Sequence, residues 1–141
     1  MHAPTLVFSK GKQLTVYLQN REGALASLAT FLGRHGVNIY GLSLSDTEDH
    51  GYARLIVDDT EKARQLVEDS GELVTEQDVL LVHVENEPGE LGRMLQVLAD
   101  HRINIDYGYS FGGPGTEKGL ALMPSNVEVA LSFLQKDVPL P

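Results

Sequence analysis

The sequence contains no cysteine, and this absence removes several kinds of chemistry together. Without thiols there are no disulfides, no Cys-x-x-Cys metal sites, no iron–sulfur clusters and no cysteine nucleophiles. Long hydrophobic runs are also missing near the start of the chain, where the apolar stretch is only Leu6-Val7-Phe8. This stretch is far too short for a signal-peptide core or a membrane span. We therefore expect a soluble cytoplasmic protein without a membrane partner.

Basic residues are scarce: 11 lysines and arginines stand against 20 aspartates and glutamates, which gives a net charge of -9. Proteins that hold nucleic acid or an anionic membrane surface normally carry a basic face, so both partners are disfavoured. With 42% hydrophobic and 22% charged residues, the composition is that of a folded chain. A length of 141 residues allows one domain or two small ones that share a core.

An internal repeat organises the chain. Residues 14–39 and 80–105 match at an offset of 66 positions. The identical pairs are Leu14/Leu80, Val16/Val82, Asn20/Asn86, Gly23/Gly89, Leu25/Leu91, Leu32/Leu98, His35/His101, Asn38/Asn104 and Ile39/Ile105. Chance would give about one or two identities over such a window, so we infer a duplicated unit.

The spacing of apolar residues predicts a strand followed by a helix at the start of each half. Apolar and polar residues alternate over residues 14–19 and 80–84, which is the period of a half-buried strand. In the next segment, leucines and their equivalents recur at i, i+3, i+4 and i+7. The helical sets are Leu25, Leu28, Ala29 and Leu32 in one half, and Leu91, Met94, Leu95 and Leu98 in the other.

The remaining elements complete a βαββαβ order in each half. The first half continues with strands up to about Ser45 and over 52–57, a polar turn between them, a helix capped by Asp59 or Thr60, and a strand over 73–77. The second half has strands over 105–111 and 119–123, and a capping box of Ser125 and Glu128 before its last helix. This order predicts an α+β fold of two tandem ferredoxin-like repeats, with helices on one face of antiparallel sheets that pack together.

These patterns divide the chain into an N-terminal extension (1–11), a first repeat (12–77) and a second repeat (78–141). After Gln135 the second repeat has only six residues, two of them prolines, so its fourth strand is truncated or absent. An uncovered sheet edge invites aggregation. We expect residues 5–8 of the extension to help cover it.

The turn between the first strand and the first helix is the part of each repeat best suited to bind a ligand. It reads Asn20-Arg21-Glu22-Gly23-Ala24-Leu25 in one half and Asn86-Glu87-Pro88-Gly89-Glu90-Leu91 in the other. A helix start offers free main-chain N–H groups to a carboxylate, and a glycine allows close approach. The same residues also suit an ordinary turn, with proline at the first helical position.

A second asparagine, Asn38 or Asn104, begins the following strand in each half. The loop into this strand can come near an adjoining subunit or repeat, so two asparagines and a glycine turn could bracket one amino acid. An asparagine side chain supplies both an acceptor and a donor for that purpose.

The paired pattern Asn-x-x-Gly-x-Leu, helix, then Val/Ile-Asn-Ile resembles the ACT domain, a βαββαβ module that binds amino acids and regulates metabolic enzymes. The resemblance covers residues 12 to about 135 and is closest to stand-alone tandem ACT proteins, some of them related to acetolactate synthase. It implies ligands at the repeat interface, against the glycine turns, and no cofactor. The implied binding residues are Asn20, Gly23, Leu25, Asn38, Ile39, Asn86, Pro88, Gly89, Leu91, Asn104 and Ile105.

Two departures from the family pattern bear on the ligand. Serine-binding members have a histidine two residues before the turn asparagine, where this chain has Leu18 and Val84. The apolar replacements favour a branched-chain or aromatic amino acid over serine. The first turn also has Glu22 where many members have proline.

The remaining polar residues form no recognisable catalytic or metal site. The five histidines lack metal-ligand spacing, and His35 and His101 fall at predicted helix ends, where they suit the helix dipole. Tyr107, Tyr109 and Phe111 alternate along a strand and fit sheet packing better than a ligand surface. The serines have no partnered base. We therefore predict a protein that is not an enzyme.

Three functions stay open on the sequence. The first is a regulatory amino-acid sensor that acts as a homodimer and changes a partner enzyme's activity when ligand binds. The second is an accessory subunit of an amino-acid biosynthetic enzyme, similar to that of acetolactate synthase, acting by protein contact alone. The third is a small enzyme.

Overall fold

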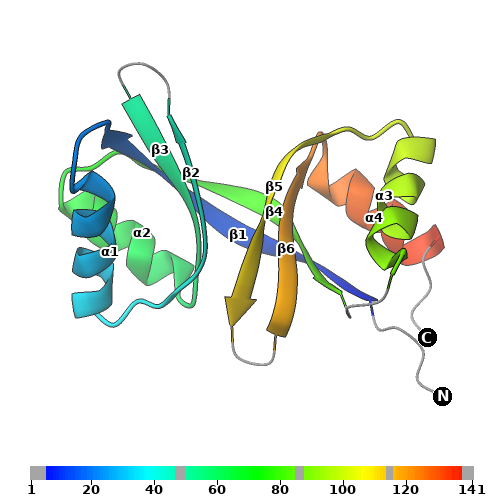
Figure 1. The fold of residues 1–141 in the computed structure, drawn as a ribbon, viewed down its shortest axis with the longest axis horizontal. Coiled ribbons are helices and arrows are strands. Elements are labelled where there is room, and N and C mark those ends of the chain that lie inside the picture. The colour runs from blue at the N-terminus through cyan, green and yellow to red at the C-terminus, as the bar shows by residue number, and fades with distance from the viewer. Residues whose placement is uncertain (1–5, 47–49, 85–87, 114–115, 138–141) are drawn as a thin grey trace. The chain divides into compact units, whose positions relative to one another are not determined.

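The computed structural model describes residues 6–46, 50–84, 88–113 and 116–137 (Figure 1). Its strands and helices follow the predicted order. They are β1 (Leu6–Gln19), α1 (Ala24–Arg34), β2 (Ile39–Asp46), β3 (His50–Val57), α2 (Thr60–Asp69), β4 (Val74–Val84), α3 (Glu90–Asp100), β5 (Ile105–Gly113), β6 (Thr116–Pro124) and α4 (Val127–Asp137).

The chain divides into two compact units. Lys12–Gln77 form one, called the first repeat below, and Asp78–Pro141 together with Met1–Gly11 form the other, called the second repeat. Each is an antiparallel sheet with two helices on one face (Figure 1), which confirms the tandem ferredoxin-like fold.

In the first repeat, β3 pairs with both β1 and β2. The inward positions of these strands carry aliphatic residues, and the buried leucines and valines of α1 and α2 pack against them. The segment just before β4 lies beside β1, because the Tyr17 N–H of β1 donates to the carbonyl of Leu73 at 2.9 Å. The fully buried Gln13 donates from Nε2 to Gln77 Oε1 at 3.1 Å, so its burial is compensated.

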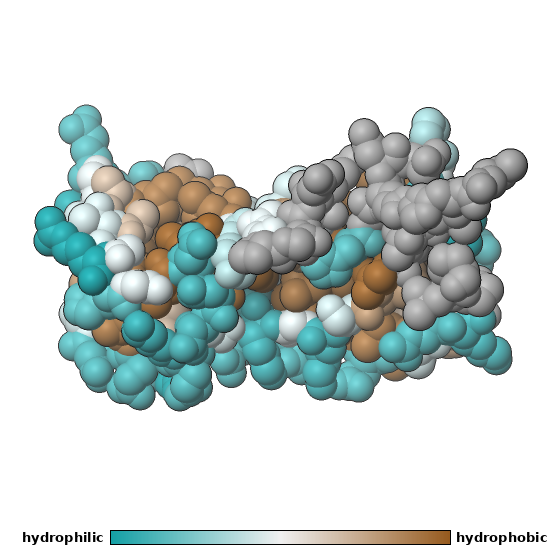
Figure 2. Space-filling view, turned by 90° about the horizontal axis from the view of Figure 1, so that it is seen from below, coloured by the Kyte–Doolittle hydropathy of each residue, from teal (hydrophilic) through white to brown (hydrophobic). Residues whose placement is uncertain are grey.

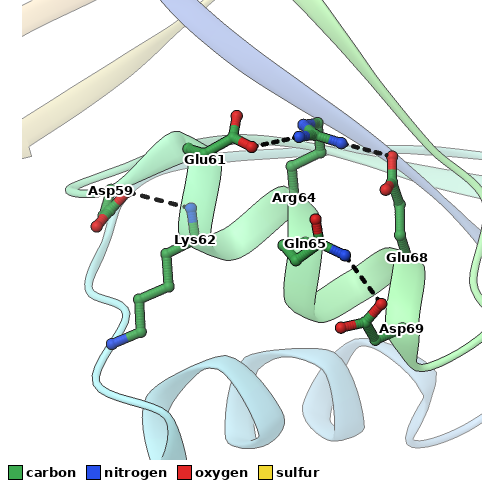
Figure 3. Close-up of polar contacts among 7 residues, drawn as sticks. All are labelled: Asp59, Glu61, Lys62, Arg64, Gln65, Glu68 and Asp69. Carbon is green, nitrogen blue, oxygen red and sulfur yellow. Dashed lines mark hydrogen bonds and ion pairs between the residues drawn. The ribbon is translucent and has the colours of Figure 1, made fainter.

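Helix α2 begins as the sequence predicts, at an aspartate cap. Asp59 Oδ1 accepts the Lys62 N–H at 3.1 Å (Figure 3). On its outer face Arg64 bridges Glu61 and Glu68, three residues before and four after it (Figure 3). The hydrogen bonds to these carboxylates raise the pKa of Arg64. This polar face points away from the core that the buried Ala63 and Val67 of α2 help to form.

In the second repeat, β6 pairs with both β4 and β5. The core is built from Leu80, Val82, Met94, Leu98 and Leu134, which come from β4, α3 and α4. β5 alternates half-buried and exposed residues along its whole length, and its aromatic residues occupy the half-buried positions. Half-burial is compatible with packing within the sheet, and Tyr109 also lines a groove of the second repeat.

The structure differs from the sequence-based predictions in two strands. The segments 73–77 and 80–84, predicted as separate strands, form the single strand β4. The opening strand, predicted from residue 14, begins at Leu6, so residues 6–11 of the extension are part of β1. Phe8 packs against the second repeat's core, whereas coverage of the sheet edge by residues 5–8 stays a prediction, and Thr5 lies outside the described residues.

The capping box predicted for α4 is wrong. The Val129 N–H donates to Asn126 Oδ1 at 3.0 Å, so Asn126 and not Ser125 is the cap. The Ser125 N–H donates instead to the carbonyl of Asn104 at 2.9 Å, and Glu128 binds Lys10.

Candidate functional site

Glycine forms the helix start in both strand-to-helix turns. Gly23 precedes α1 with φ 82° and ψ -5°, and Gly89 precedes α3 with φ 90° and ψ -13°. L-residues with a side chain rarely adopt this left-handed conformation, so glycine is required here by the backbone. Within the described residues, no side-chain hydrogen bond caps either helix, and the first-turn N–H groups have no side-chain acceptor there.

The space in front of both glycines is open. A Cβ atom built on Gly23 or Gly89 meets nothing within 4 Å. No described side chain therefore crowds the Cβ position of either glycine. A helix start of this kind favours negative charge, because its N–H groups and its dipole point toward the opening.

A hollow of about 230 Å³ lies beside the first turn. Its polar wall is the turn itself, with Asn20 and Arg21. Its apolar wall is made by Leu18, Leu25 and Leu44, which come from β1, α1 and β2. A second hollow of about 320 Å³ shares Arg21 and extends to residues at the end of α2, including Ser70 and Glu72.

Of the predicted residues in the first repeat, the structure brings Asn20 and Leu25 together at this hollow beside Gly23. Asn38 lies elsewhere. On β3, Gln19 pairs with His50 and Ile39 pairs with Val57, so the end of β1 and the start of β2 are seven strand residues apart. That is about 23 Å at the usual rise per residue. Within one repeat, Asn20 and Asn38 do not share a pocket.

Asn38 instead ties the start of β2 to the end of β3. Its N–H donates to Asp58 Oδ1 at 3.0 Å, and its carbonyl accepts the Asp58 N–H at 3.1 Å. Ile39 packs against the core of the first repeat. The contacts that the structure shows for these two residues are structural.

In the second repeat, Asn86 lies outside the described residues. Leu91, Asn104 and Ile105 line a shallow groove of about 620 Å³ along α3 and β5. Pro88 and Gly89 are exposed and do not line it. Asn104 donates from Nδ2 to Asp106 Oδ1 at 3.0 Å. Among the described residues, it is therefore in the first repeat that the strand-to-helix turn lines a hollow.

Sequence reasoning missed Arg21 as a candidate, although it lies inside the turn. Its guanidinium carries a positive charge beside the helix start, and it lines both hollows. The position of a charged residue between the asparagine and the glycine of a turn that occurs in both halves could have identified Arg21 from the sequence. Leu44, Ser70 and Glu72 come from other elements and reach the hollows only through the folded sheet.

The histidines behave as helix-end residues. His35 ends α1, with Nδ1 2.9 Å from the Phe31 carbonyl, and His101 ends α3, where its ring stacks on Phe133 at 3.7 Å.

Among the residues that the structure describes, no group of three His, Cys, Asp or Glu is placed to hold a metal ion. No helix in the described ranges is both long and apolar enough to cross a membrane.

Comparison with known proteins supports the fold and identifies the family. The structure aligns with the protein BT0572 of Bacteroides thetaiotaomicron, with 28% identity, a TM-score of 0.83, and coverage of 93% of this chain and 90% of that one. It also aligns with the ligand-free regulatory subunit of aspartate kinase from Thermus thermophilus, with 13% identity, a TM-score of 0.63, and coverage of 94% and 95%. A search of curated proteins gives no match. The family model that matches residues 10–131 is the ACT domain pair, and the chain belongs to this family.

Proposed function

We propose that the chain is a regulatory amino-acid sensor, not an enzyme, and that the first strand-to-helix turn holds its ligand. Membership of the ACT domain pair family supports the amino-acid-binding and regulatory class. The observation that carries the proposal is the open, uncapped glycine turn before α1, with Arg21 and a hollow beside it. The second turn is a further candidate with the same glycine geometry.

The walls of the hollow suit the two halves of an amino acid. A carboxylate has the α1 N–H groups and the Arg21 guanidinium as donors, while the Asn20 carbonyl oxygen can accept from an ammonium group. Leu18, Leu25 and Leu44 offer an apolar surface to the ligand's side chain. A branched-chain or aromatic amino acid matches this surface better than a polar one, because apolar burial drives binding.

The test is a thermal-shift panel of the twenty amino acids on the full chain. A ligand that binds only the folded protein adds about 2.7 kcal/mol of stability at one hundred times its Kd. We expect one or a few apolar amino acids to raise the Tm, and serine to have no effect. If no amino acid shifts the Tm at millimolar concentration, the sensor proposal is overturned.

Two arginine variants then test the position of the site. Arg21 lies in the turn before α1, and Arg34 is the exposed last residue of the same helix. Arg21→Gln should weaken ligand binding at least about tenfold, whereas Arg34→Gln should leave it unchanged. If both variants bind the ligand with equal affinity, the ligand does not bind at the first turn.

A second candidate function is an accessory subunit that acts by protein contact alone. Leu42 and Leu44 of β2 are 44% and 54% exposed, which is unusual for large aliphatic residues on neighbouring inward positions of a strand. Figure 2 likewise shows apolar areas open between hydrophilic side chains on the face it draws. Failure of the thermal-shift panel, combined with stable binding to a biosynthetic enzyme, would favour this function. The homodimer and the identity of any partner enzyme stay predictions.

A further inference from the structure

The hollow of about 320 Å³ in the first repeat is lined by the start of one helix and by the end of another. Helix α1 contributes the buried Leu28 and the half-buried Phe31, and the turn before α1 contributes Arg21. Ser70, which ends α2, and Glu72, which follows it, also line the hollow. A helix carries partial positive charge at its start and partial negative charge at its end. Both signs therefore meet in one hollow.

The charged side chains of this hollow have the same two signs and do not neutralise each other. The Arg21 guanidinium donates to the carbonyl of Glu22 at 3.4 Å, which is long for a hydrogen bond. Glu72 has neither a hydrogen bond nor an ion pair in the described part of the chain, unlike the two α2 carboxylates that Arg64 binds. Arg21 and Glu72 therefore both keep bonding capacity for a ligand.

The end of α2 offers acceptors to a positively charged donor. Ser70 Oγ donates its proton to the carbonyl of Val67 at 2.7 Å, so its oxygen is left to accept. The last turn of α2 contains no basic residue, although the negative end of the helix dipole favours a cation there. The Glu72 carboxylate adds a full negative charge. An ammonium group has the donors and the charge that match these groups.

We infer, building on the proposed function, that Glu72 is the partner of the ligand's ammonium group and makes the site select amino acids over their 2-oxo acids. Arg21 lines both hollows, so it can hold the carboxylate where they meet. The ligand's apolar side chain then occupies the hollow of about 230 Å³, and its ammonium group faces the hollow of about 320 Å³. A 2-oxo acid has the same carboxylate and side chain, but it has no ammonium donor, and the Glu72 charge repels it.

Two pairs of ligands test this inference on the full chain. They are leucine with 4-methyl-2-oxopentanoate and phenylalanine with phenylpyruvate, with affinities measured by isothermal titration calorimetry. The unaltered chain should bind the amino acid of a pair more tightly than the 2-oxo acid. Glu72→Gln should weaken amino-acid binding at least about fivefold and leave 2-oxo-acid binding unchanged or tighter, because the variant removes both the attraction and the repulsion.

Glu76→Gln is the matched control. Glu76 is an exposed carboxylate of β4 that lines neither hollow, and its substitution changes the net charge by the same amount. This variant should keep the ratio of the two affinities. An unchanged ratio in Glu72→Gln, or an equal change of the ratio in Glu76→Gln, would overturn the inference.

Arg21→Gln separates a failure of this inference from a failure of the proposed function. Both ligands of a pair carry a carboxylate, so this variant should weaken both of them. If it does so while Glu72→Gln keeps the ratio, the site is correct and the role of Glu72 is wrong. If neither leucine nor phenylalanine binds the unaltered chain, the inference is overturned, and the panel of twenty amino acids decides whether the proposed function fails with it.

Discussion

At the residue scale, Arg102 has an unusual backbone conformation. It is the one residue other than glycine with a positive φ in the ranges that the structure describes, at 59°. The equivalent position in the first repeat, 66 residues earlier, is Gly36, which has φ 82°. Both residues follow a helix, and both adopt the left-handed conformation that ends it. A side chain in this conformation costs about 1 kcal/mol, which glycine avoids.

We therefore expect Arg102→Gly to raise the free energy of unfolding by up to about 0.5 kcal/mol, because the relief of about 1 kcal/mol of backbone strain exceeds the added entropy of the unfolded chain. Gly36→Ala is the matched reverse change and should lower it by about 1 kcal/mol. Urea unfolding of both variants measures the two effects. A loss of stability in Arg102→Gly would show that the arginine side chain contributes more than its backbone strain costs.

At the element scale, helix α4 shows where local patterns mislead. Ser125 and Glu128 fit the capping-box template, yet long-range contacts use both residues differently. The Ser125 N–H bonds to Asn104, and Glu128 pairs with Lys10, which is 118 positions away. The next residue, Asn126, is an equally good cap by propensity and takes the role. A template of four residues cannot register contacts with partners so distant in sequence.

Removing the true cap should weaken α4 measurably. Asn126→Ala deletes the acceptor of the Val129 N–H and should lower the free energy of unfolding by about 1 kcal/mol. Ser125→Ala keeps the main-chain bond to Asn104 and should change it by less than about 0.5 kcal/mol. Chemical denaturation measures the free energy of unfolding of both variants. A larger loss in Ser125→Ala than in Asn126→Ala would support the capping box that the sequence predicts.

The sequence pattern of the strands likewise predicted which residues face the core but not where each strand begins. Alternation located the inward faces of β1 and β4 correctly, since Leu14, Val16, Leu80 and Val82 are all fully buried. It could not show that β1 starts at Leu6, because residues 9–13 break the alternation with polar residues and a glycine. Only pairing with distant strands makes that stretch extended.

At the scale of the whole molecule, the acidic excess should affect stability. A net charge of -9 repels itself in the compact state. Salt screens this repulsion, which stabilises the fold, and also screens the exposed ion pairs of Lys10 and Arg64, which destabilises it. Because carboxylates outnumber cations, the stabilising effect should be the larger one. We expect the urea midpoint at pH 7 to rise as NaCl is added. Near the calculated pI of about 4.9 the salt effect should shrink, and an equal or larger effect there would contradict this explanation.

The candidate site was predictable in part. Asn20, Gly23 and Leu25 follow from the repeat, because duplicated turns keep the same glycine conformation. The distance between Asn20 and Asn38 depends on the order and direction of three strands, and no spacing in the sequence measures it. Leu44 and Glu72 reach the hollows only after β2 and α2 have packed.

Residues 6–11 of β1, which belong to the same compact unit as residues 78–141, also affect the order in which the molecule can fold during synthesis. Gly11 leaves the ribosome 70 residues before Leu81, against which it packs. The first repeat has all its strands once Gln77 has emerged, whereas the second repeat also needs α4 and residues 6–11, which are synthesised before the first repeat. Residues 6–11 therefore have no partner from the second repeat until the elements of residues 78–137 have been synthesised.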